Sequence, residues 1–405
     1  MNLLFLTMST DIDNITKSGI YTDLIRKFSN EGHDVYVVYP RERREKRETG
    51  IIHNRKIHTL GVKTLNLTKT NIVEKGIGQI LLEKQFKNAI RKFLNNVTFD
   101  IILYSTPPIT FTKVIEDAKK NNPQAITYLL LKDIFPQNAV DLGLLSKSGI
   151  EGILYRFFKE KEHRLYRISD YIGCMSPANV NYILKHNPEL DPIKLEIAPN
   201  SYDIPKEKNV TISTDTIRNT YKLPVDKPIF IYGGNMGKPQ GIPFLIKCLD
   251  SIKDRRDCHF VIIGNGTEYS KLEYWYKINQ PSSVSIFKYL PKEEYDQLAG
   301  ACDVGLIFLD YRFTIPNYPS RLLTYLMKKK PIVAVTDPIS DVGTIAEENK
   351  YGFHCLSNSV EAFVGTIDRI ISSDIKKMGE NGYQYFLNNY TIYHTYNAVV
   401  KHVEK

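Results

Sequence analysis

The sequence of 405 residues predicts an α/β protein with two parallel-sheet domains. One observation is that short apolar runs alternate with helical segments, as in sheets whose two faces are covered by helices. A second observation is that a polar stretch without periodicity, residues 199–214, separates two series of such runs. A chain of this length typically holds two or three domains, so each series is predicted to form one domain.

The first series begins with the apolar run NLLFLTM, which is typical of a strand buried on both faces. Apolar residues then recur at helical spacing from Ile20 to Phe28, and Gly32 is a usual end for a helix. The apolar run that follows completes a βαβ unit, and further runs come later in this half. The strands predicted here are residues 2–8, 33–40, 100–108, 125–133 and 171–176.

The second series repeats the same alternation. Apolar residues recur at helical spacing in residues 242–252, and the chain from about residue 372 is predicted to be helical. The predicted strands are residues 228–234, 259–266, 284–290, 304–309 and 331–335. We therefore expect an N-terminal domain of residues 1–203, a C-terminal domain of residues 204–385 and a terminal helix in residues 386–405.

Composition narrows the class of protein. The net charge of +9 would suit nucleic acid, an anionic membrane or phosphate-bearing substrates, but no nucleic-acid-binding motif is found. The charged segment at residues 41–48 is interpreted as a solvated loop. No apolar run approaches the roughly 18 residues of a membrane span, and the N-terminus has no basic leader, so a cytoplasmic protein is expected. The five cysteines form no CxxC pair, and no metal site is predicted.

Two glycine-containing turns follow neighbouring predicted strands. YGGNMGKPQG occupies residues 232–241, and IIGNGTE occupies residues 262–268. A backbone without Cβ can approach a ligand closely, and the amides at the start of the following helix suit phosphate. Because the carboxyl ends of parallel strands meet at one edge, the two turns together favour a ligand site. Each turn alone fits a purely structural role equally well.

A cation at the start of a predicted helix is a third indication of an anionic ligand. In NYPSRLLTY, Ser320 stands at the N-cap, and Arg321 lies in the first turn, where the helix dipole disfavours cations. An anion bound between Arg321 and the helix end would explain this placement, since arginine can bind a diphosphate through two hydrogen bonds. A solvated arginine that reaches sideways is the alternative.

Several segments, in this order and spacing, resemble glycosyltransferase family 4. In the second half they are YGGNMGKPQGIPFLIKCL, FVIIGNGTE, YLPKEEYDQLAGACDVGLIFL and PSRLLTYLMKKKPIVA. In the first half they are KSGIYTDLIRKFSNEGHDVYVV, KDIFPQNAVDLGLL, CMSPANVNYIL and IAPNSYD. The resemblance spans nearly the whole chain and is greatest to the WbuB-like bacterial enzymes that build capsule and O-antigen polysaccharide.

The resemblance implies the GT-B fold, two Rossmann-like domains facing a central cleft, with the terminal helix packed back on the first domain. It implies retaining transfer of a sugar, expected to be N-acetylated, from a UDP-sugar substrate without a bound metal or other cofactor. The expected acceptor is a saccharide or an undecaprenyl-diphosphate-linked saccharide in capsule, O-antigen or lipopolysaccharide synthesis. The residues expected at the donor are Gly19, Gly234, Asn235, Gly237, Gln240, Gly264, Asn265, Gly266, Tyr289, Leu290, Ser320, Leu322 and Thr324.

Two departures from the family pattern bear on the donor. The Glu-x7-Glu pair of many members falls near Pro316 and at Thr324, and neither residue is acidic. Thr324 could therefore offer the ribose only a neutral hydrogen bond. An arginine and a lysine that follow the family's glycine turn are replaced by Asn235 and Gln240.

Breaking the bond between a sugar and a nucleoside diphosphate leaves negative charge on the diphosphate. Preorganised donors that stabilise this charge should supply the largest catalytic contribution. We expect Lys238 and Arg321 to be catalytic in this sense, with help from Ser320 and the loop at residues 233–237. No DxD-type metal motif is evident, which agrees with transfer that needs no divalent ion.

On the acceptor side, Asp133 follows a predicted strand of the first domain and is the predicted catalytic carboxylate. It could orient or partly deprotonate the acceptor hydroxyl, although a turn aspartate is the alternative interpretation. Thr106 is a weaker acceptor-binding candidate, and Gly19 is expected to permit close approach of a phosphate at the first βα turn.

Two segments are basic and amphipathic, residues 76–94 and residues 152–169. They fit helices packed on a core with solvated backs, or an interfacial patch that docks on anionic lipid. The second interpretation predicts a peripheral protein on the inner face of the cell membrane, where a lipid-linked acceptor would lie.

Two other functions are alternatives to glycosyl transfer. A UDP-sugar 2-epimerase shares the GT-B layout, but epimerases need paired acid and base groups near the sugar, and no clear pair is evident. A non-catalytic two-domain binding protein would normally be exported, and no leader is seen.

Overall fold

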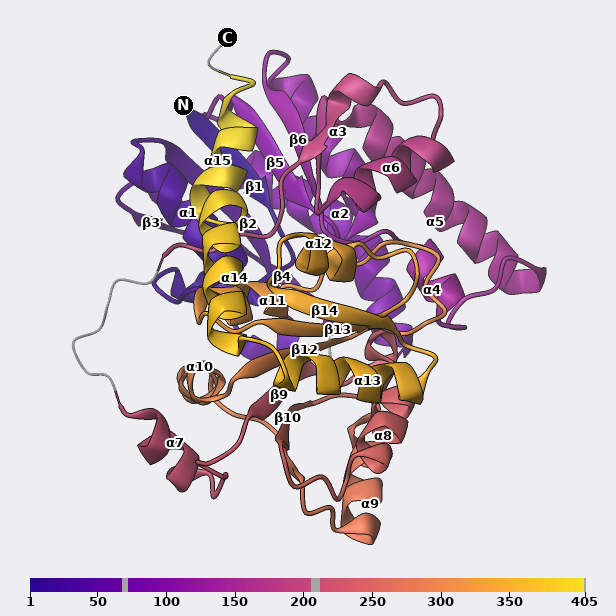
Figure 1. Ribbon diagram of the computed structural model, residues 1–405. Coiled ribbons are helices and arrows are strands. Elements are labelled where there is room, and N and C mark those ends of the chain that lie inside the picture. Colours follow the sequence, from indigo (N-terminus) through magenta and orange to yellow (C-terminus); the bar gives the residue numbers. More distant parts are fainter. Residues whose placement is uncertain (68–71, 205–211, 404–405) are drawn as a thin grey trace. The chain divides into compact units, whose positions relative to one another are not determined.

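The computed structural model describes residues 1–67, 72–204 and 212–403, and it divides into two compact units (Figure 1). The first unit comprises Met1–Asp203 with Tyr390–Lys405, and the second comprises Ile204–Asn389. The chain thus returns to the first unit at its C-terminal end. In the part of the chain that is described, no helix is both long and apolar enough to cross a membrane.

The first unit contains an eight-stranded sheet. Its strands are β1 (Asn2–Leu6), β2 (Asp34–Glu42), β3 (Gly50–Asn54), β4 (Ile57–Thr64), β5 (Ile101–Ser105), β6 (Ile126–Leu131), β7 (Tyr171–Cys174) and β8 (Leu195–Ile197). Their order across the sheet is β3-β4-β2-β1-β5-β6-β7-β8. Every pair is parallel except β3 and β4, which pair antiparallel at the edge.

The strands predicted from apolar runs are confirmed in both halves, but β3, β4 and β8 were not predicted. The charged segment at residues 41–48 differs from its interpretation as a solvated loop only at its first two residues, because residues 43–48 are exposed or partly exposed. Arg41 and Glu42 are buried at the end of β2, and the Arg41 guanidinium donates to the Tyr39 hydroxyl at 3.0 Å. A Cβ at Gly61 in β4 would lie 2.0 Å from Arg41, so the bare backbone of β4 makes room for this buried arginine.

Helices cover the first sheet. They are α1 (Ile20–Asn30), α2 (Ile72–Phe93), α3 (Thr112–Asn121), α4 (Gln137–Asp141), α5 (Gly149–Ile168), α6 (Pro177–His186) and α15 (Ile392–Val400). Helix α15 lies along α1 (Figure 1) and adds Ile392 and Val399 to the same apolar core as Phe28. The Tyr396 hydroxyl lies 2.9 Å from Nε2 of His33, which follows α1. The C-terminal segment is therefore part of the core of the first unit.

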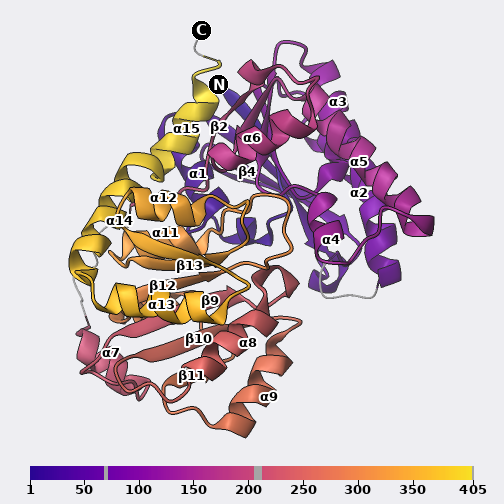
Figure 2. The same ribbon diagram turned by 45° about the vertical axis from the view of Figure 1, so that its right-hand side comes forward.

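The second unit contains a fully parallel six-stranded sheet in the order β11-β10-β9-β12-β13-β14. Its strands are β9 (Ile229–Asn235), β10 (His259–Asn265), β11 (Val284–Phe287), β12 (Val304–Phe308), β13 (Ile332–Thr336) and β14 (Gly352–Leu356). Only β14 was not predicted. Helices α8 (Ile242–Ser251), α9 (Tyr269–Asn279) and α13 (Val360–Ile371) cover one face (Figure 2), where Leu245, Leu272 and Phe363 join one apolar core.

The remaining helices of the second unit are α7 (Thr214–Thr220), α10 (Lys292–Ala301), α11 (Arg321–Met327), α12 (Val342–Glu348) and α14 (Ile375–Asn389). The predicted helical tail is thus two helices, α14 in the second unit and α15 in the first. Part of the polar stretch at residues 199–214 lies outside the described residues.

Because Val399 is fully buried in the core of the first unit, Val399→Ala should lower the free energy of unfolding by about 2 kcal/mol. Asn397→Ala on the exposed side of the same helix should leave the stability unchanged or slightly raise it, since alanine has the higher helix propensity. Urea unfolding followed by circular dichroism measures both variants. Equal midpoints for the two would contradict the packing of α15 on α1.

Candidate functional site

In the second unit, β9 and β10 end beside each other in the two glycine-containing turns. Their pairing places Gly234 opposite Gly264 and Asn235 opposite Asn265. The Met236 amide then donates to the Asn265 carbonyl at 2.8 Å, so the contact continues past the strands. The two turns form one backbone surface at the carboxyl edge of the sheet, where α/β proteins bind ligands.

Backbone packing requires glycine in these turns. A Cβ at Gly264 would lie 1.9 Å from the Gly234 carbonyl oxygen, and Gly264 has a φ of +154°. A Cβ at Gly266, also at +154°, would lie 2.5 Å from the Met236 carbonyl oxygen. The glycines of the two turns therefore have a structural role, which was one of the two interpretations of the sequence. A ligand role is compatible with it, because Gly234 and Gly266 remain exposed on the outer side of the turns.

Arg321, the first residue of α11, lies against this edge. Its guanidinium carbon is 4.4 Å from the centroid of the Tyr232 ring, and a Cβ at Gly234 would lie 3.3 Å from Nη2. Nη1 is buried without a hydrogen-bond partner, and no carboxylate in the described residues pairs with this guanidinium. Burial lowers the pKa of Arg321, but the surrounding tyrosines outweigh this and raise it, so the group stays charged. Arg321 is thus a partly buried cation, with Nη1 fully buried, that pairs with no anion among the described residues.

Tyrosines that the sequence analysis did not single out form the support of this edge. The Tyr325 hydroxyl accepts the Gly233 amide at 3.3 Å and donates to the Ile231 carbonyl at 3.1 Å, and burial raises its pKa to about 12. A Cβ at Gly233 would lie 2.2 Å from the Tyr295 ring. The Tyr232 hydroxyl donates to a main-chain carbonyl three residues ahead, at 2.9 Å. The spacing of four residues between Arg321 and Tyr325, one helical turn, was the available indication.

The turn after β9 contains the other predicted cation. Lys238 is exposed at the start of a short 3-10 helix, Lys238–Gln240. The Gln240 side-chain oxygen accepts the Gly237 amide at 3.1 Å, so Gln240 closes this turn. Asn235 is exposed at the tip of β9. Of these predicted donor residues, Lys238 and Asn235 carry side chains open to a ligand, whereas Gln240 is engaged within the turn.

The remaining predicted donor residues of this unit differ in accessibility. Ser320 occupies the N-cap position of α11 and is exposed, but its side chain makes no capping hydrogen bond. Leu322 is fully buried, and its amide donates to the Pro319 carbonyl. Thr324 is partly buried on α11, one turn after Ser320. Tyr289 is highly exposed after β11, and the neighbouring Leu290 is partly buried.

In the first unit, the structure brings the predicted Thr106 and Asp133 together. The buried Thr106 hydroxyl accepts the amides of Lys132 at 2.9 Å and Asp133 at 3.1 Å. The Asn138 side-chain amide donates to the Asp133 carboxylate at 2.8 Å. Burial raises the pKa of Asp133 to about 6, although the bond from Asn138 opposes the rise. Thr106 thus fixes the turn that presents Asp133 at the carboxyl end of β6.

Lys132 precedes Asp133 in the sequence and was not singled out from it. Its ammonium group donates to the Ala198 carbonyl at 2.9 Å. Burial lowers its pKa to about 7, with the nearby Cys174 opposing the change. A lysine of this kind can change charge near neutral pH, so the edge of the first sheet holds two titratable groups with displaced pKa values.

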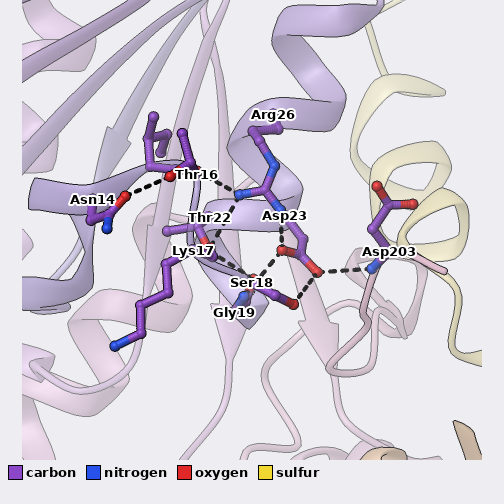
Figure 3. Close-up of polar contacts among 10 residues, drawn as sticks. Asn14, Thr16, Lys17, Ser18, Gly19, Thr22, Asp23, Arg26 and Asp203 are labelled. Atoms are coloured by element: carbon purple, nitrogen blue, oxygen red, sulfur yellow. Dashed lines mark hydrogen bonds and ion pairs between the residues drawn. The ribbon is translucent and has the colours of Figure 1, made fainter. Parts of the chain in front are cut away.

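Figure 3 shows the surroundings of Gly19, which precedes α1. The Gly19 amide donates to the buried Asp23 carboxylate at 3.0 Å, and the Asp203 amide donates to the same carboxylate at 2.9 Å. The Ser18 hydroxyl and the Arg26 guanidinium also donate to it. The N-terminus of α1 is therefore occupied by an internal anion. Gly19 has an extended φ of −177°, a conformation open to any residue.

The chemistry available at the two edges is different. At the edge of the second unit, Arg321 and Lys238 offer positive charge beside exposed glycine backbone, which suits a phosphate-bearing ligand. At the edge of the first unit, Asp133 offers a carboxylate that can accept a proton. Within the described ranges, no group of three or more His, Cys, Asp and Glu side chains is arranged to hold a metal ion.

Sequence comparisons relate the second unit to one family. Residues 213–385 match the family model for glycosyl transferases group 1. WbjE of Pseudomonas aeruginosa, named as a probable glycosyltransferase, is 25% identical over 271 residues, or 65% of this chain and 64% of WbjE. WcaI of Escherichia coli K12, named as a colanic acid biosynthesis glycosyl transferase, is 28% identical over 174 residues, or 42% of each chain. The matched segments cover less than two thirds of either relative.

Solved structures match the whole chain. Sucrose-phosphate synthase from Thermosynechococcus elongatus superposes with a TM-score of 0.77 at 14% identity and covers 100% of this chain and 98% of its own. HepE from Anabaena, solved in complex with UDP, has a TM-score of 0.69 at 12% identity and covers 100% of both chains. The chain has the GT-B fold. The predicted α/β class with two parallel-sheet domains is confirmed, apart from the antiparallel edge pair β3–β4.

The packing of the glycine turns predicts a clear difference between two glycine substitutions. Gly264→Ala should lower the free energy of unfolding by at least about 2 kcal/mol, because its φ and the Gly234 carbonyl both exclude a Cβ. Gly365→Ala, at an exposed position of α13 with nothing within 4 Å, should raise it by about 0.5–1 kcal/mol. Urea midpoints of the two variants test this, and a stable Gly264→Ala protein would show that the turns can separate.

Proposed function

We propose that this protein is a glycosyltransferase that moves a sugar from a UDP-sugar to a saccharide acceptor. The family match of residues 213–385 and the names of WbjE and WcaI support the reaction class. The HepE structures carry UDP, or UDP with glucose, which supports UDP as the nucleotide of the donor. The observation that carries the proposal is the partly buried guanidinium of Arg321 beside the glycine turns, which pairs with no carboxylate among the described residues.

On the donor side, we propose that the diphosphate of the UDP-sugar supplies the anion that Arg321 lacks. Arginine presents two parallel N–H groups to phosphate oxygens, and Nη1 has no competing hydrogen-bond partner among the described residues. The Tyr232 ring holds the guanidinium plane from one side. As the bond to the sugar breaks, Arg321 and the exposed Lys238 would stabilise the charge that develops on the leaving phosphate.

On the acceptor side, we propose that Asp133 orients the acceptor hydroxyl and accepts its proton. A carboxylate with a pKa of about 6 is ionised at neutral pH and is a stronger base than an ordinary aspartate. Thr106 and Asn138 hold it in place and act as positioning residues.

We further propose the finer features that the family resemblance implies. Transfer would retain the configuration at the anomeric carbon and need no bound metal or other cofactor. The donor would be a UDP-linked N-acetylated sugar, and the acceptor a saccharide or an undecaprenyl-diphosphate-linked saccharide. The WbuB-like assignment would place the protein in capsule or O-antigen synthesis, as a cytoplasmic protein held peripherally at the inner face of the cell membrane.

The reaction is tested by measuring UDP release from a panel of UDP-sugars with and without lipid-linked saccharide. Release that depends on acceptor supports the proposal. Epimerised free sugar without acceptor would support the 2-epimerase instead, and the structure offers no particular observation in favour of that reaction.

Arg321→Met should weaken UDP binding about 10- to 100-fold, the loss expected for a charge-assisted hydrogen bond to phosphate. Without UDP, the variant should be about as stable as the parent, because it removes a partly buried cation that pairs with no anion among the described residues. Arg369→Met is the matched control, since Arg369 also stacks on an aromatic ring, at 4.2 Å from Phe353. Calorimetric titration with UDP and melting temperatures without it give both readouts. Unchanged UDP affinity with lowered stability would show that Arg321 is only structural.

Protonation of Asp133 should set the acid limb of the pH profile of kcat/KM. Below about pH 6 the carboxylate is protonated, so kcat/KM should fall about tenfold per pH unit. Asp133→Asn should remove this limb together with most of the activity. Asn138→Ala removes a bond that lowers the pKa of Asp133, so the limb should move to higher pH while activity at high pH persists. A limb that stays in place in Asn138→Ala would assign it to another group.

A further inference from the structure

The first half of α5 exposes an apolar face. Ile150, Ile153, Leu154 and Phe157 are 87%, 61%, 46% and 52% exposed. Their spacing of three, four and seven residues from Ile150 places all four on one side of the helix. We call these four residues the α5 ridge. Leu144, in the turn before the helix, is 58% exposed and extends the apolar surface.

The ridge lies at the start of α5, where the backbone is closely packed, and residues of the second half of the helix are buried in the first unit. The Gly152 amide donates to the Ser148 carbonyl at 2.9 Å, and a Cβ at Gly152 would lie 2.5 Å from the Lys147 carbonyl oxygen. The far half of α5 is anchored in the first unit by the buried Leu165 and Tyr166. Figures 1 and 2 show the end of α5 that carries the ridge extending past α6. The exposed apolar side chains thus lie on the half of α5 that precedes its anchored half.

Residues 76–94 are the other amphipathic segment predicted as a lipid-docking candidate. Their described side chains form no exposed apolar face. The apolar residues Leu82 and Phe86 are fully buried in α2, and Ala89 is nearly so. Leu81 is 38% exposed, and the side chains of residues 76, 77, 79 and 80 lie outside the described residues. Of the two segments, only the one in α5 shows an uncovered apolar face among the described side chains.

Cations surround the ridge. Lys147 lies ahead of it, and Arg156, on the helix itself, is exposed without a carboxylate partner among the described residues. Lys161 follows it, 5.8 Å from the Phe157 ring and 3.5 Å from the Glu83 carboxylate. From Leu144 to Glu162 there are four lysines and arginines and three glutamates, and Lys159 pairs with Glu162 at 2.6 Å. The exposed apolar face is flanked by the cations Lys147 and Arg156. This combination suits a lipid bilayer, whose interior is apolar and whose headgroups can carry negative charge.

We propose that the α5 ridge docks the protein on an anionic lipid surface, with Ile153 and Phe157 entering the headgroup boundary. The proposal rests on the proposed function, because a lipid-linked acceptor would bring the substrate to that surface. A second copy of this chain fits less well. In a two-fold contact between ridges, the flanking cations of one copy would face those of the other.

The test is flotation with phosphatidylcholine vesicles that contain phosphatidylglycerol, compared with pure phosphatidylcholine. We expect the parent to float with the anionic vesicles and to be released by high salt. The double variant Ile153→Ser, Phe157→Ser should bind them at least about tenfold less. The matched control is Tyr274→Ser, Ile278→Ser on α9, which removes two side chains that are 70% and 62% exposed at the same spacing of four residues. It should float like the parent.

Three outcomes would overturn the proposal. The parent could remain in the soluble fraction, the ridge variant could float as well as the parent, or sedimentation could show a dimer that the ridge variant dissociates. Circular dichroism confirms that each variant is folded. UDP release with a water-soluble acceptor should be the same in the ridge variant and the parent. Vesicle binding without any sugar transfer would therefore refute the proposed function alone, and transfer without vesicle binding would refute the docking surface alone.

Discussion

Contact between two bare backbone turns is the constraint on which the candidate donor site depends. Gly264 can lie against the Gly234 carbonyl only because it carries no Cβ and adopts a φ that other residues avoid. This contact fixes the exposed backbone beside which the Arg321 guanidinium lies, above the Tyr232 ring. The geometry of the edge is set by main chain and by a packed aromatic ring, which is how a site is held ready before its ligand arrives.

The two units differ in whether a charged side chain near the start of a helix is paired within the protein. In the first unit, Asp23 is a buried anion that accepts from the amides of Gly19 and Asp203 and from Arg26, so its charge is satisfied internally. In the second unit, Arg321 is a partly buried cation whose Nη1 is buried, and the described residues supply no anion for it. An unpaired buried charge is costly, and a fold keeps one where a ligand completes the pair. This difference is why we assign the diphosphate to the second unit.

The sequence predicted every strand that is buried on both faces and rich in apolar residues. It missed β3, an exposed antiparallel edge strand, and β4, β8 and β14, whose polar or short sequences show no apolar run. It placed Arg321 correctly at the start of a helix and Asp133 just after a strand, because the ends of helices and strands can be predicted from the local sequence. Tyr325 could not be found in this way. Its hydroxyl binds the Gly233 amide, 92 residues away in the sequence, and only the folded sheet brings them together.

The amphipathic segments of α2 and α5 show that the sequence alone also could not predict which apolar faces are exposed. Both have apolar residues at helical spacing among cations, and only packing distinguishes them, since Phe86 is covered and Phe157 is not. Helix α5 belongs to the same unit as Asp133, the proposed acceptor carboxylate. Under the proposed function, docking of that unit on a lipid surface would bring a membrane-bound acceptor to Asp133, while the water-soluble donor would bind the other unit. The division of charge between the units and the position of the exposed ridge would then follow, under the proposed function, from the different solubilities of the two substrates.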